Sequence, residues 1–176
     1  VLNPKRPDCM YPFKELAGVG VALKLCQSLQ KATGIGDWQD YLDYVCLGTV
    51  ADIVSLIGEN RILVKEGLLA LAKTNKPGLQ ALLEISSIKS EKIDTRQVAF
   101  GLAPRINAAG RLGDASTAVQ LLLTDNYEEA RDIASHLNRG NQQRQKIESL
   151  VMAEALEIIK DKSFLARDKV LVLGSD

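Results

Sequence analysis

The longest helical pattern in the sequence begins at Asn126 and reaches about Lys162. Glu129 follows Asn126 by three residues, which is typical of a capping box at a helix start. Residues 138–146 (NRGNQQRQK) lie inside this pattern but contain no large apolar side chain. Because a helix that is polar on every side has to bridge two domains or cross a solvent-filled cleft, we expect its two ends to lie on different domains. The alternative is a surface loop around Gly140 that joins two shorter helices.

The rest of the chain is predicted to form shorter helices and one strand. Apolar spacing and capping residues indicate helices at Glu15–Lys31, Trp38 to about Asp52, Glu59–Lys73, Pro77–Ile85, Asp94 or Thr95 to about Pro104, and Asp114–Leu123. Pro104 is expected to end its helix because the residue before a proline resists helical dihedral angles, which leaves residues 105–113 as a loop. The run Val170–Leu173 is a strand candidate. The expected fold is mainly α.

Composition limits the classes of function. The sequence is 46% hydrophobic and 25% charged, which is ordinary for a globular protein. Lys and Arg total 22, as do Asp and Glu, so no global positive field attracts a polyanion and any contact with nucleic acid must be local. No phosphate-binding Walker loop, dinucleotide fingerprint or Ser/His/Asp triad is recognisable.

The cysteines and the hydropathy pattern bear on the compartment. Cys9, Cys26 and Cys46 are 17 and 20 residues apart, which fits neither a zinc site nor a secreted disulfide framework. We therefore expect reduced thiols and a cytoplasmic location. No basic and apolar leader and no apolar run of membrane-spanning length is present, so no membrane association is expected.

Asp52 is the most informative single residue. It is the only charged side chain in residues 45–57 (VCLGTVADIVSLI), so an environment of valine, leucine and isoleucine is expected around it. A buried carboxylate is unfavourable by several kcal/mol unless a metal, a cation or strong hydrogen-bond donors compensate it. Asp52 is therefore interpreted either as a helix-terminus or structural hydrogen-bonding residue, or as a metal ligand.

Two further segments could contact phosphate. Residues 101–113 (GLAPRINAAGRLG) combine Arg105, Asn107 and Arg111 with small residues that allow a ligand to approach the backbone. The alternative is a plain connection capped by Asp114, whose charge would repel an anion. The second segment begins at Arg139 and has three positive charges by residue 146, but no aromatic side chain for base stacking, so it could equally be a solvated face.

Five sequence motifs, in order along nearly the whole chain, resemble one known family. They are Asn3-Pro4-Lys5, residues 11–22 (YPFKELAGVGVA), residues 47–52 (LGTVAD), Glu59-Asn60-Arg61 and residues 104–111 (PRINAAGR). The combination is similar to the RecJ family, which comprises single-strand-specific 5′→3′ DNA exonucleases of the DHH phosphoesterase superfamily. The polar segment 138–146 also resembles the helix that connects the two core domains in this family.

The resemblance implies a fold and a division into domains. Residues 1–125 would be the helical C-terminal part of an α/β DHH catalytic domain. Residues 126–162 would be the connecting helix, and residues 163–176 would begin the DHH-associated domain with a terminal strand.

The resemblance also implies a chemistry. Family members use a two-metal centre of Mn²⁺ or Mg²⁺, in which Asp52 would be a catalytic metal ligand from the fourth of four motifs. Arg105, Asn107 and Arg111 would line the cleft for single-stranded DNA, and we add Arg139 as a nucleic-acid contact. The first three motifs, including the Asp-His-His triplet, and the later Gly-Gly-His motif do not occur in this sequence. We therefore expect both ends to be cuts, the remaining domains of the parent protein to be partners, and the isolated chain to be inactive.

Three other functions fit parts of the sequence. One is a DHH phosphodiesterase that acts on short oligonucleotides or cyclic dinucleotides. Another is a non-catalytic DHH scaffold for replication proteins, although such a scaffold would be expected to lose metal ligands such as Asp52. The third is an unrelated helical interaction module, in which Asp52 would lie in the interior, far from any cleft.

Overall fold

The described part of the chain is mainly helical. The computed structural model describes residues 2–89, 91–112, 115–160, 170 and 172–174, without the side chains of residues 111 and 112. Its elements are α1 (Gly18–Thr33), η1 (Trp38–Tyr41), α2 (Leu42–Ala51), α3 (Gly58–Ala72), α4 (Pro77–Ile85), α5 (Thr95–Gln97), η2 (Val98–Leu102), α6 (Ala103–Leu112), α7 (Ser116–Leu123) and α8 (Tyr127–Ile159). None of the described residues is in a strand, which confirms the mainly α fold. The terminal strand is not confirmed, since Val170, Val172 and Leu173 are non-helical but unpaired, and Leu171 lies outside the described residues.

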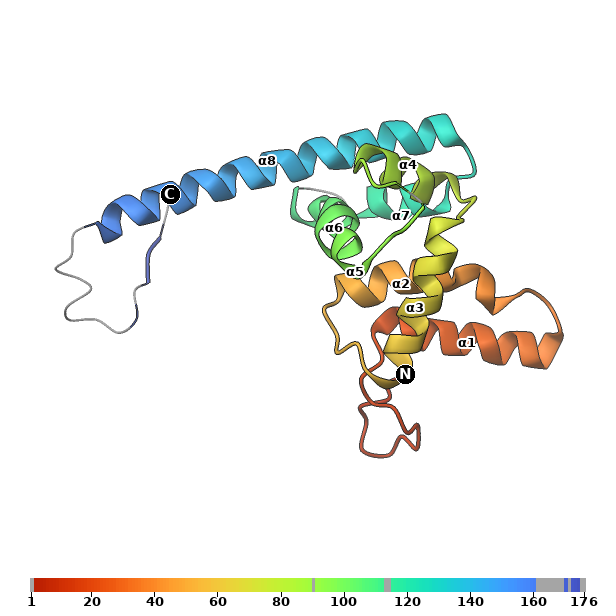
Figure 1. Ribbon diagram of the computed structural model, residues 1–176. Coiled ribbons are helices and arrows are strands. Elements are labelled where there is room, and N and C mark those ends of the chain that lie inside the picture. Colours follow the sequence, from red (N-terminus) through yellow and green to blue (C-terminus); the bar gives the residue numbers. More distant parts are fainter. Residues whose placement is uncertain (1, 90, 113–114, 161–169, 171, 175–176) are drawn as a thin grey trace.

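Helix α2 lies at the centre of the body (Figure 1) and packs against α1, α3, η2 and α6. It is apolar on nearly all sides, as expected for a buried helix. One face contributes Val45 to a small cluster with α1 and α3, whereas Cys46, Leu47 and Val50 belong to the main core. Side chains of α4, η2, α6, α7 and the first half of α8 complete that main core.

Two glycines allow helix backbones to approach closely. A Cβ atom on Gly67 of α3 would lie 2.4 Å from the carbonyl oxygen of Leu42, where α3 meets α2. A Cβ atom on Gly78 of α4 would lie 1.8 Å from the carbonyl oxygen of Leu121 in α7. Both distances are far inside van der Waals contact, so a larger side chain at either position would push two helices apart.

Helix α8 is continuous through Gly140, so the alternative of two helices joined by a loop is wrong. Asn126 caps it, since its Oδ1 accepts hydrogen bonds from the backbone N–H groups of Glu128 and Glu129 at 2.9 and 3.1 Å. The Glu129 carboxylate binds Gln120 and Thr124 rather than the backbone of Asn126, so the cap forms without a complete capping box. The first half of α8 packs on α4, α6 and α7, and the second half projects from the body (Figure 1).

Pro104 does not end a helix, which corrects the expectation of a loop over residues 105–113. The backbone widens into a π-helical turn at residues 98–102, where the N–H of Ala103 donates to the carbonyl of Val98, five residues back. Proline lacks an N–H group, and its ring clashes with the carbonyl four residues earlier in a regular α-helix. The wider turn shifts the hydrogen-bond register just before the proline, and α6 continues through it.

Candidate functional site

Asp52 ends helix α2, and its side chain is exposed. The expectation of a buried carboxylate is wrong, because α2 ends at Ala51 and the chain turns out to the surface at this residue. Only the backbone is fixed here, with the Asp52 N–H donating to the carbonyl of Gly48 at 3.0 Å. A helix C-terminus carries a partial negative charge, to which the carboxylate adds its own. This position therefore favours a cation and disfavours an anion.

The loop that follows Asp52 has an unusual and fixed conformation. Ile53 has a φ of 55° and is 90% exposed. For a β-branched residue, the left-handed region costs roughly 1–2 kcal/mol. Asn60, which is fully buried, holds the loop by donating from Nδ2 to the carbonyl of Ser55 at 3.1 Å and to that of Glu15 at 2.6 Å.

This loop and the α5–α6 region form the two walls of a groove of about 470 Å³, called the Asp52 groove below. Its lining residues are Val50, Ala51, Ile53, Val54, Leu56, Thr95, Arg96, Ala99, Phe100, Ala103, Pro104 and Asn107. The two neighbours of Asp52 in the sequence thus line the same groove as Asn107, which is exposed. The fold brings together the LGTVAD and PRINAAGR motifs, which are more than fifty residues apart in the sequence. Asp52 is exposed at a groove and not in the interior, which argues against the unrelated interaction module.

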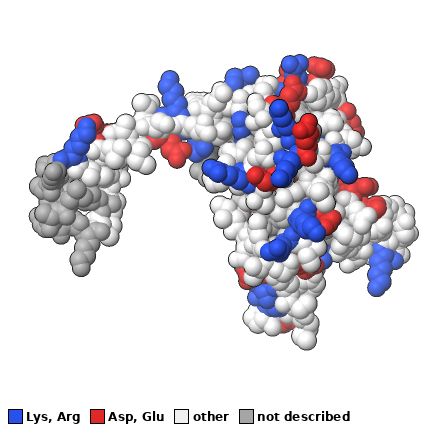
Figure 2. Space-filling model, viewed as in Figure 1, with Lys and Arg blue, Asp and Glu red and all other residues white. Residues whose placement is uncertain are grey.

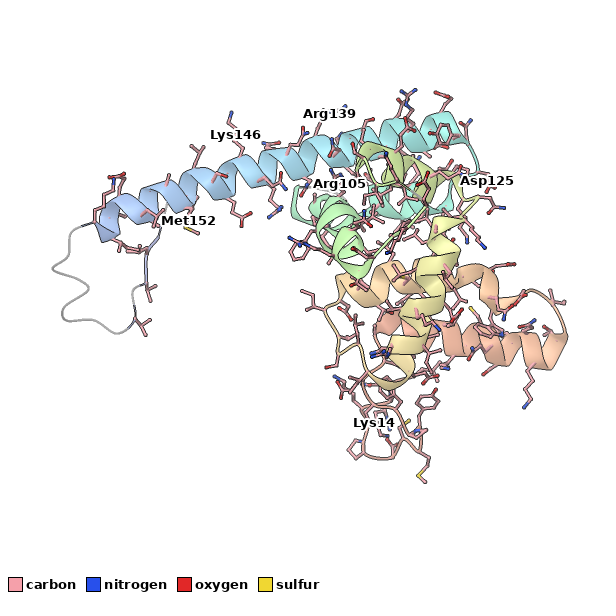
Figure 3. The ribbon with its side chains drawn as sticks, viewed as in Figure 1. Lys14, Arg105, Asp125, Arg139, Lys146 and Met152 are labelled. Atoms are coloured by element: carbon pink, nitrogen blue, oxygen red, sulfur yellow. The ribbon has the colours of Figure 1, made fainter. Side chains whose placement is uncertain are left out.

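Arg105 is positioned differently from Asn107, between α6 and α8 (Figure 3). Its Nε donates to Oδ1 of Asn138 in α8 at 2.9 Å, and its Nη1 donates to the carbonyl of Gly101. Burial lowers the pKa of the Arg105 guanidinium. The side chain is therefore engaged in holding α6 against the polar segment of α8. That segment was expected to bridge two domains or cross a cleft, and within the described residues its first part instead packs on the body, since Asn138 is half-buried and Asn141 is buried.

We expect Arg105→Leu to lower the free energy of unfolding by about 1–3 kcal/mol, because the half-buried acceptors of Asn138 and Gly101 lose their charged donor. Chemical denaturation followed by circular dichroism would measure this change. Arg139→Leu is the matched control, since Arg139 is exposed and a surface substitution usually changes stability by less than about 0.5 kcal/mol. Equal effects of the two substitutions would contradict the role assigned to Arg105.

Arg139, another predicted contact, does not line the groove. Arg139 projects from α8 on the side turned away from α6, as does Lys146 (Figure 3). Arg111 is a residue of α6, but the structure does not describe its side chain. Lys/Arg and Asp/Glu side chains are interspersed over the face shown in Figure 2, with no broad area of one sign.

Asp52 cannot hold a metal ion with its neighbours alone. Within the described part of the chain, no three His, Cys, Asp or Glu side chains lie close enough together to bind a metal. Hydrolytic Mg²⁺ or Mn²⁺ sites need several oxygen or imidazole ligands. The described residues therefore do not form a metal centre by themselves, although Asp52 can supply one oxygen ligand to a shared one.

Comparisons with known proteins give matches both in sequence and in fold. No protein-family model matches the chain. The single-stranded-DNA-specific exonuclease RecJ of Bacillus subtilis is 41% identical over 163 residues, which cover 92% of this chain and 20% of that protein. The crystal structure of Thermus thermophilus RecJ in complex with Mn²⁺ superposes with a TM-score of 0.76 at 39% identity and covers 86% of this chain. By sequence and by structure, the chain is homologous to one part of RecJ. A second RecJ structure from T. thermophilus, in complex with Mg²⁺, gives a TM-score of 0.75.

The match to RecJ covers most of this chain but only a small share of each relative's length. The chain spans about a fifth of the B. subtilis protein and 22% of the Mn²⁺-bound T. thermophilus chain. Both solved structures are described as metal complexes, with Mn²⁺ in one and Mg²⁺ in the other. No described helix is at once long enough and apolar enough to cross a lipid bilayer.

Sequence reasoning proposed Asp52 and Asn107 as site residues but did not predict the apolar walls of the groove. Phe100 was expected in a helix, and helical periodicity alone does not say that its side chain is 76% exposed. Arg96 and Thr95 also line the groove, although only Thr95 had been considered, as a helix cap. The left-handed Ile53 would have been difficult to predict, because a β-branched residue is disfavoured in that conformation.

Proposed function

We propose that the chain is part of a metal-dependent exonuclease that degrades single-stranded DNA in the 5′→3′ direction, in cytoplasmic DNA repair and recombination. Its 41% identity to RecJ over 163 residues carries this proposal. Residues 1–125 would belong to the catalytic domain, residues 126–162 to the connecting helix and residues 163–176 to the DHH-associated domain. The exposed Asp52 at a helix C-terminus beside a groove supports the assignment, since this position favours a cation.

In this proposal, Asp52 is one ligand of a two-metal centre of Mn²⁺ or Mg²⁺, and residues outside the chain complete the centre. When bound, such cations lower the pKa of a water molecule and neutralise charge on the scissile phosphate. The described residues have a positioning role. Asn60 fixes the loop that follows Asp52, and α6, which follows the π-helical turn, places Asn107 in the lining of the groove.

The phosphate contacts divide into two groups. Asn107 lines the Asp52 groove and is proposed to bind the DNA backbone near the reacting phosphate, together with Arg111. Arg139 lies on the outer side of α8 and would contact DNA away from the reacting phosphate. Direct contact of Arg105 with phosphate stays a prediction, and its hydrogen bonds to Asn138 and Gly101 give it a second role in holding α6.

A hybrid protein tests the proposed function. B. subtilis RecJ, with its matching segment replaced by this chain, is expected to degrade single-stranded DNA from the 5′ end when Mn²⁺ or Mg²⁺ is added. The 176-residue chain alone is expected to be inactive, because its described residues supply too few metal ligands for such a centre. Product lengths from DNA blocked at one end measure the polarity, and a cyclic dinucleotide serves as the competing substrate. A folded hybrid without nuclease activity, or one that prefers the cyclic dinucleotide, would refute the proposal.

A further inference from the structure

Residues 11–22 (YPFKELAGVGVA) contact the chain on both sides of Asp52, although the proposed function gives this motif no role. Four of its residues make these contacts and are called the brace below: Tyr11, Phe13, Glu15 and Val19. Val19 contacts α2 before Asp52, whereas the other three contact the start of α3, after the loop. Asp52 therefore lies between two places where the same motif contacts the chain.

The first contact lies one turn before Asp52. A Cβ atom on Gly48 would lie 2.9 Å from Cγ1 and 3.1 Å from Cβ of Val19, so a glycine is needed for α1 to pack this closely on α2. Val19 cannot turn aside, because a β-branched side chain is stiff and its Cβ moves only with the backbone. The carbonyl of Gly48 accepts the N–H of Asp52 at 3.0 Å. The contact between α1 and α2 is therefore made at the residue that fixes the backbone of Asp52.

The second contact lies at the far end of the loop. A Cβ atom on Gly58 would lie 2.8 Å from Cε2 of Phe13, so the aromatic ring lies directly on the backbone there. The carbonyl of Glu15 accepts from Asn60 Nδ2 at 2.6 Å, and the same Nδ2 donates to the carbonyl of Ser55 within the loop at 3.1 Å. These contacts fix the position at which the loop ends.

A charged network adds a further connection between the motif and α3. The Tyr11 hydroxyl donates to Glu59 Oε2 at 2.7 Å, and Glu59 also pairs with Lys24 of α1. The side chains of Lys24 and Glu59 are 27% and 25% exposed, so salt in the solvent screens this pair only in part. Because Glu59 directly precedes Asn60, the network also restrains the residue that holds the loop.

These contacts have to offset an unfavourable backbone conformation. Ile53, directly after Asp52, has a φ of 55°, and its side chain is 90% exposed. Such a conformation persists only when the surrounding structure over-determines it, and an exposed side chain contributes little to this. The contacts at Gly48 and at residues 58–60 supply the restraint from both sides. Strained backbone of this kind is concentrated at functional sites.

We propose that the brace positions the Asp52 carboxylate for a divalent cation, so that Val19 and Phe13 are positioning residues for this metal ligand. They act through the backbone at Gly48 and Gly58 and not by contact with a reacting atom. This inference rests on the proposed function, because it takes the cation from that function. It gives residues 11–22 a role in the site, in addition to starting α1.

Exchanging the side-chain sizes where α1 meets α2 tests the brace in the 176-residue chain. Gly48→Ala should speed hydrogen exchange of the Asp52 and Ile53 amides about tenfold or more, because overpacking pushes the helices apart and loosens the turn that these amides close. Adding Val19→Ala removes the clash and should restore slow exchange. Gly18→Ala is the matched control in α1, since its Cβ atom would meet nothing within 4 Å. Amides in the first half of α8 are the reference for global unfolding.

Mn²⁺ binding by the B. subtilis hybrid described above tests the positioning role. Gly48→Ala should weaken Mn²⁺ binding measured by calorimetry about tenfold, the lower end of the effect of a residue that supports a metal ligand. Adding Val19→Ala should restore the affinity. Phe13→Leu acts at Gly58 instead of at α2 and should also weaken Mn²⁺ binding, so the test does not depend on whether Gly48→Ala folds.

Three results would overturn the proposal. The first is unchanged exchange of the Asp52 and Ile53 amides in Gly48→Ala. The second is a lower thermal midpoint of the substituted hybrids with unchanged Mn²⁺ affinity, which would give the brace a structural role alone. The third is an unsubstituted hybrid that binds no Mn²⁺. An unsubstituted hybrid that binds Mn²⁺ but does not degrade single-stranded DNA would instead refute the proposed function and leave the positioning of Asp52 in place.

Discussion

Replacing Asp52 with asparagine is expected to reduce nuclease activity of the B. subtilis hybrid by more than about 100-fold. Substitution of a residue that only supports a metal ligand costs up to about 100-fold, and loss of a direct ligand should cost more. Asparagine has nearly the same shape but no negative charge, so it binds a divalent cation poorly. Degradation rates of 5′-labelled single-stranded DNA at several Mn²⁺ concentrations would measure the loss. The loss should persist at high Mn²⁺ if the carboxylate also aligns the reacting groups.

The same substitution should leave the fold intact. Asp52 is exposed, and its charge adds to the negative end of α2, so the free energy of unfolding of the 176-residue chain should not fall. Asp132→Asn is a matched control on the surface of α8, and it should retain full activity in the hybrid. If the Asp52→Asn hybrid degraded single-stranded DNA at the wild-type rate, the assignment of Asp52 as a metal ligand would be wrong.

Features that depend on a few neighbouring residues were predictable from the sequence. The bounds of α4 were predicted correctly because proline suits a first helical turn and the apolar spacing ends at Ile85. The predicted helix start at Trp38 is confirmed, since Asp37 caps the segment and accepts from the Gln39 N–H at 2.9 Å. Asn126 does the same for α8. Each of these signals acts within one turn of the backbone.

Features that depend on distant contacts were not predictable in the same way. Asp52 was expected to be buried because its neighbours in sequence are apolar, but the end of α2 turns the chain outward. Pro104 was expected to stop a helix, because the π-helical turn that accommodates it has no clear sequence signal. The hydrogen bond from Arg105 to Asn138 was not predicted, because the two residues are 33 positions apart in the sequence. Tertiary packing decides each of these cases.

A buried ion pair that sequence patterns did not reveal connects three helices. The Asp43 side chain is buried near the start of α2 and accepts from Lys76 Nζ at 2.8 and 2.7 Å and from Thr74 Oγ1 at 2.9 Å. Lys76 precedes α4 and also lies 4.7 Å from the centre of the Tyr44 ring. The Tyr44 hydroxyl donates to the carbonyl of Leu122 at 2.6 Å, which adds α7 to the group. Burial, followed by the nearby carboxylates of Asp43 and Asp125, raises the pKa of Tyr44 to about 12.

Lys76→Met is expected to lower the free energy of unfolding by about 3–5 kcal/mol, because a buried carboxylate that loses its cation keeps its full desolvation penalty. Methionine has a similar length and packs well on an aromatic ring, so lost volume contributes little. The thermal midpoint should fall by roughly 10 °C for a domain of this size. Thermal and urea unfolding of the 176-residue chain would measure both values.

Lys160→Met is the matched control, since Lys160 pairs with Glu157 on the surface and the two side chains are 70% and 68% exposed. An exposed ion pair contributes less than about 1 kcal/mol, so this variant should be close to wild type. Adding Asp43→Asn to Lys76→Met should restore part of the lost stability, because the unpaired charge is then removed while the amide oxygen still accepts from Thr74. Equal stability losses for Lys76→Met and Lys160→Met would mean that Thr74 and the backbone N–H of Tyr44 suffice to stabilise the buried carboxylate.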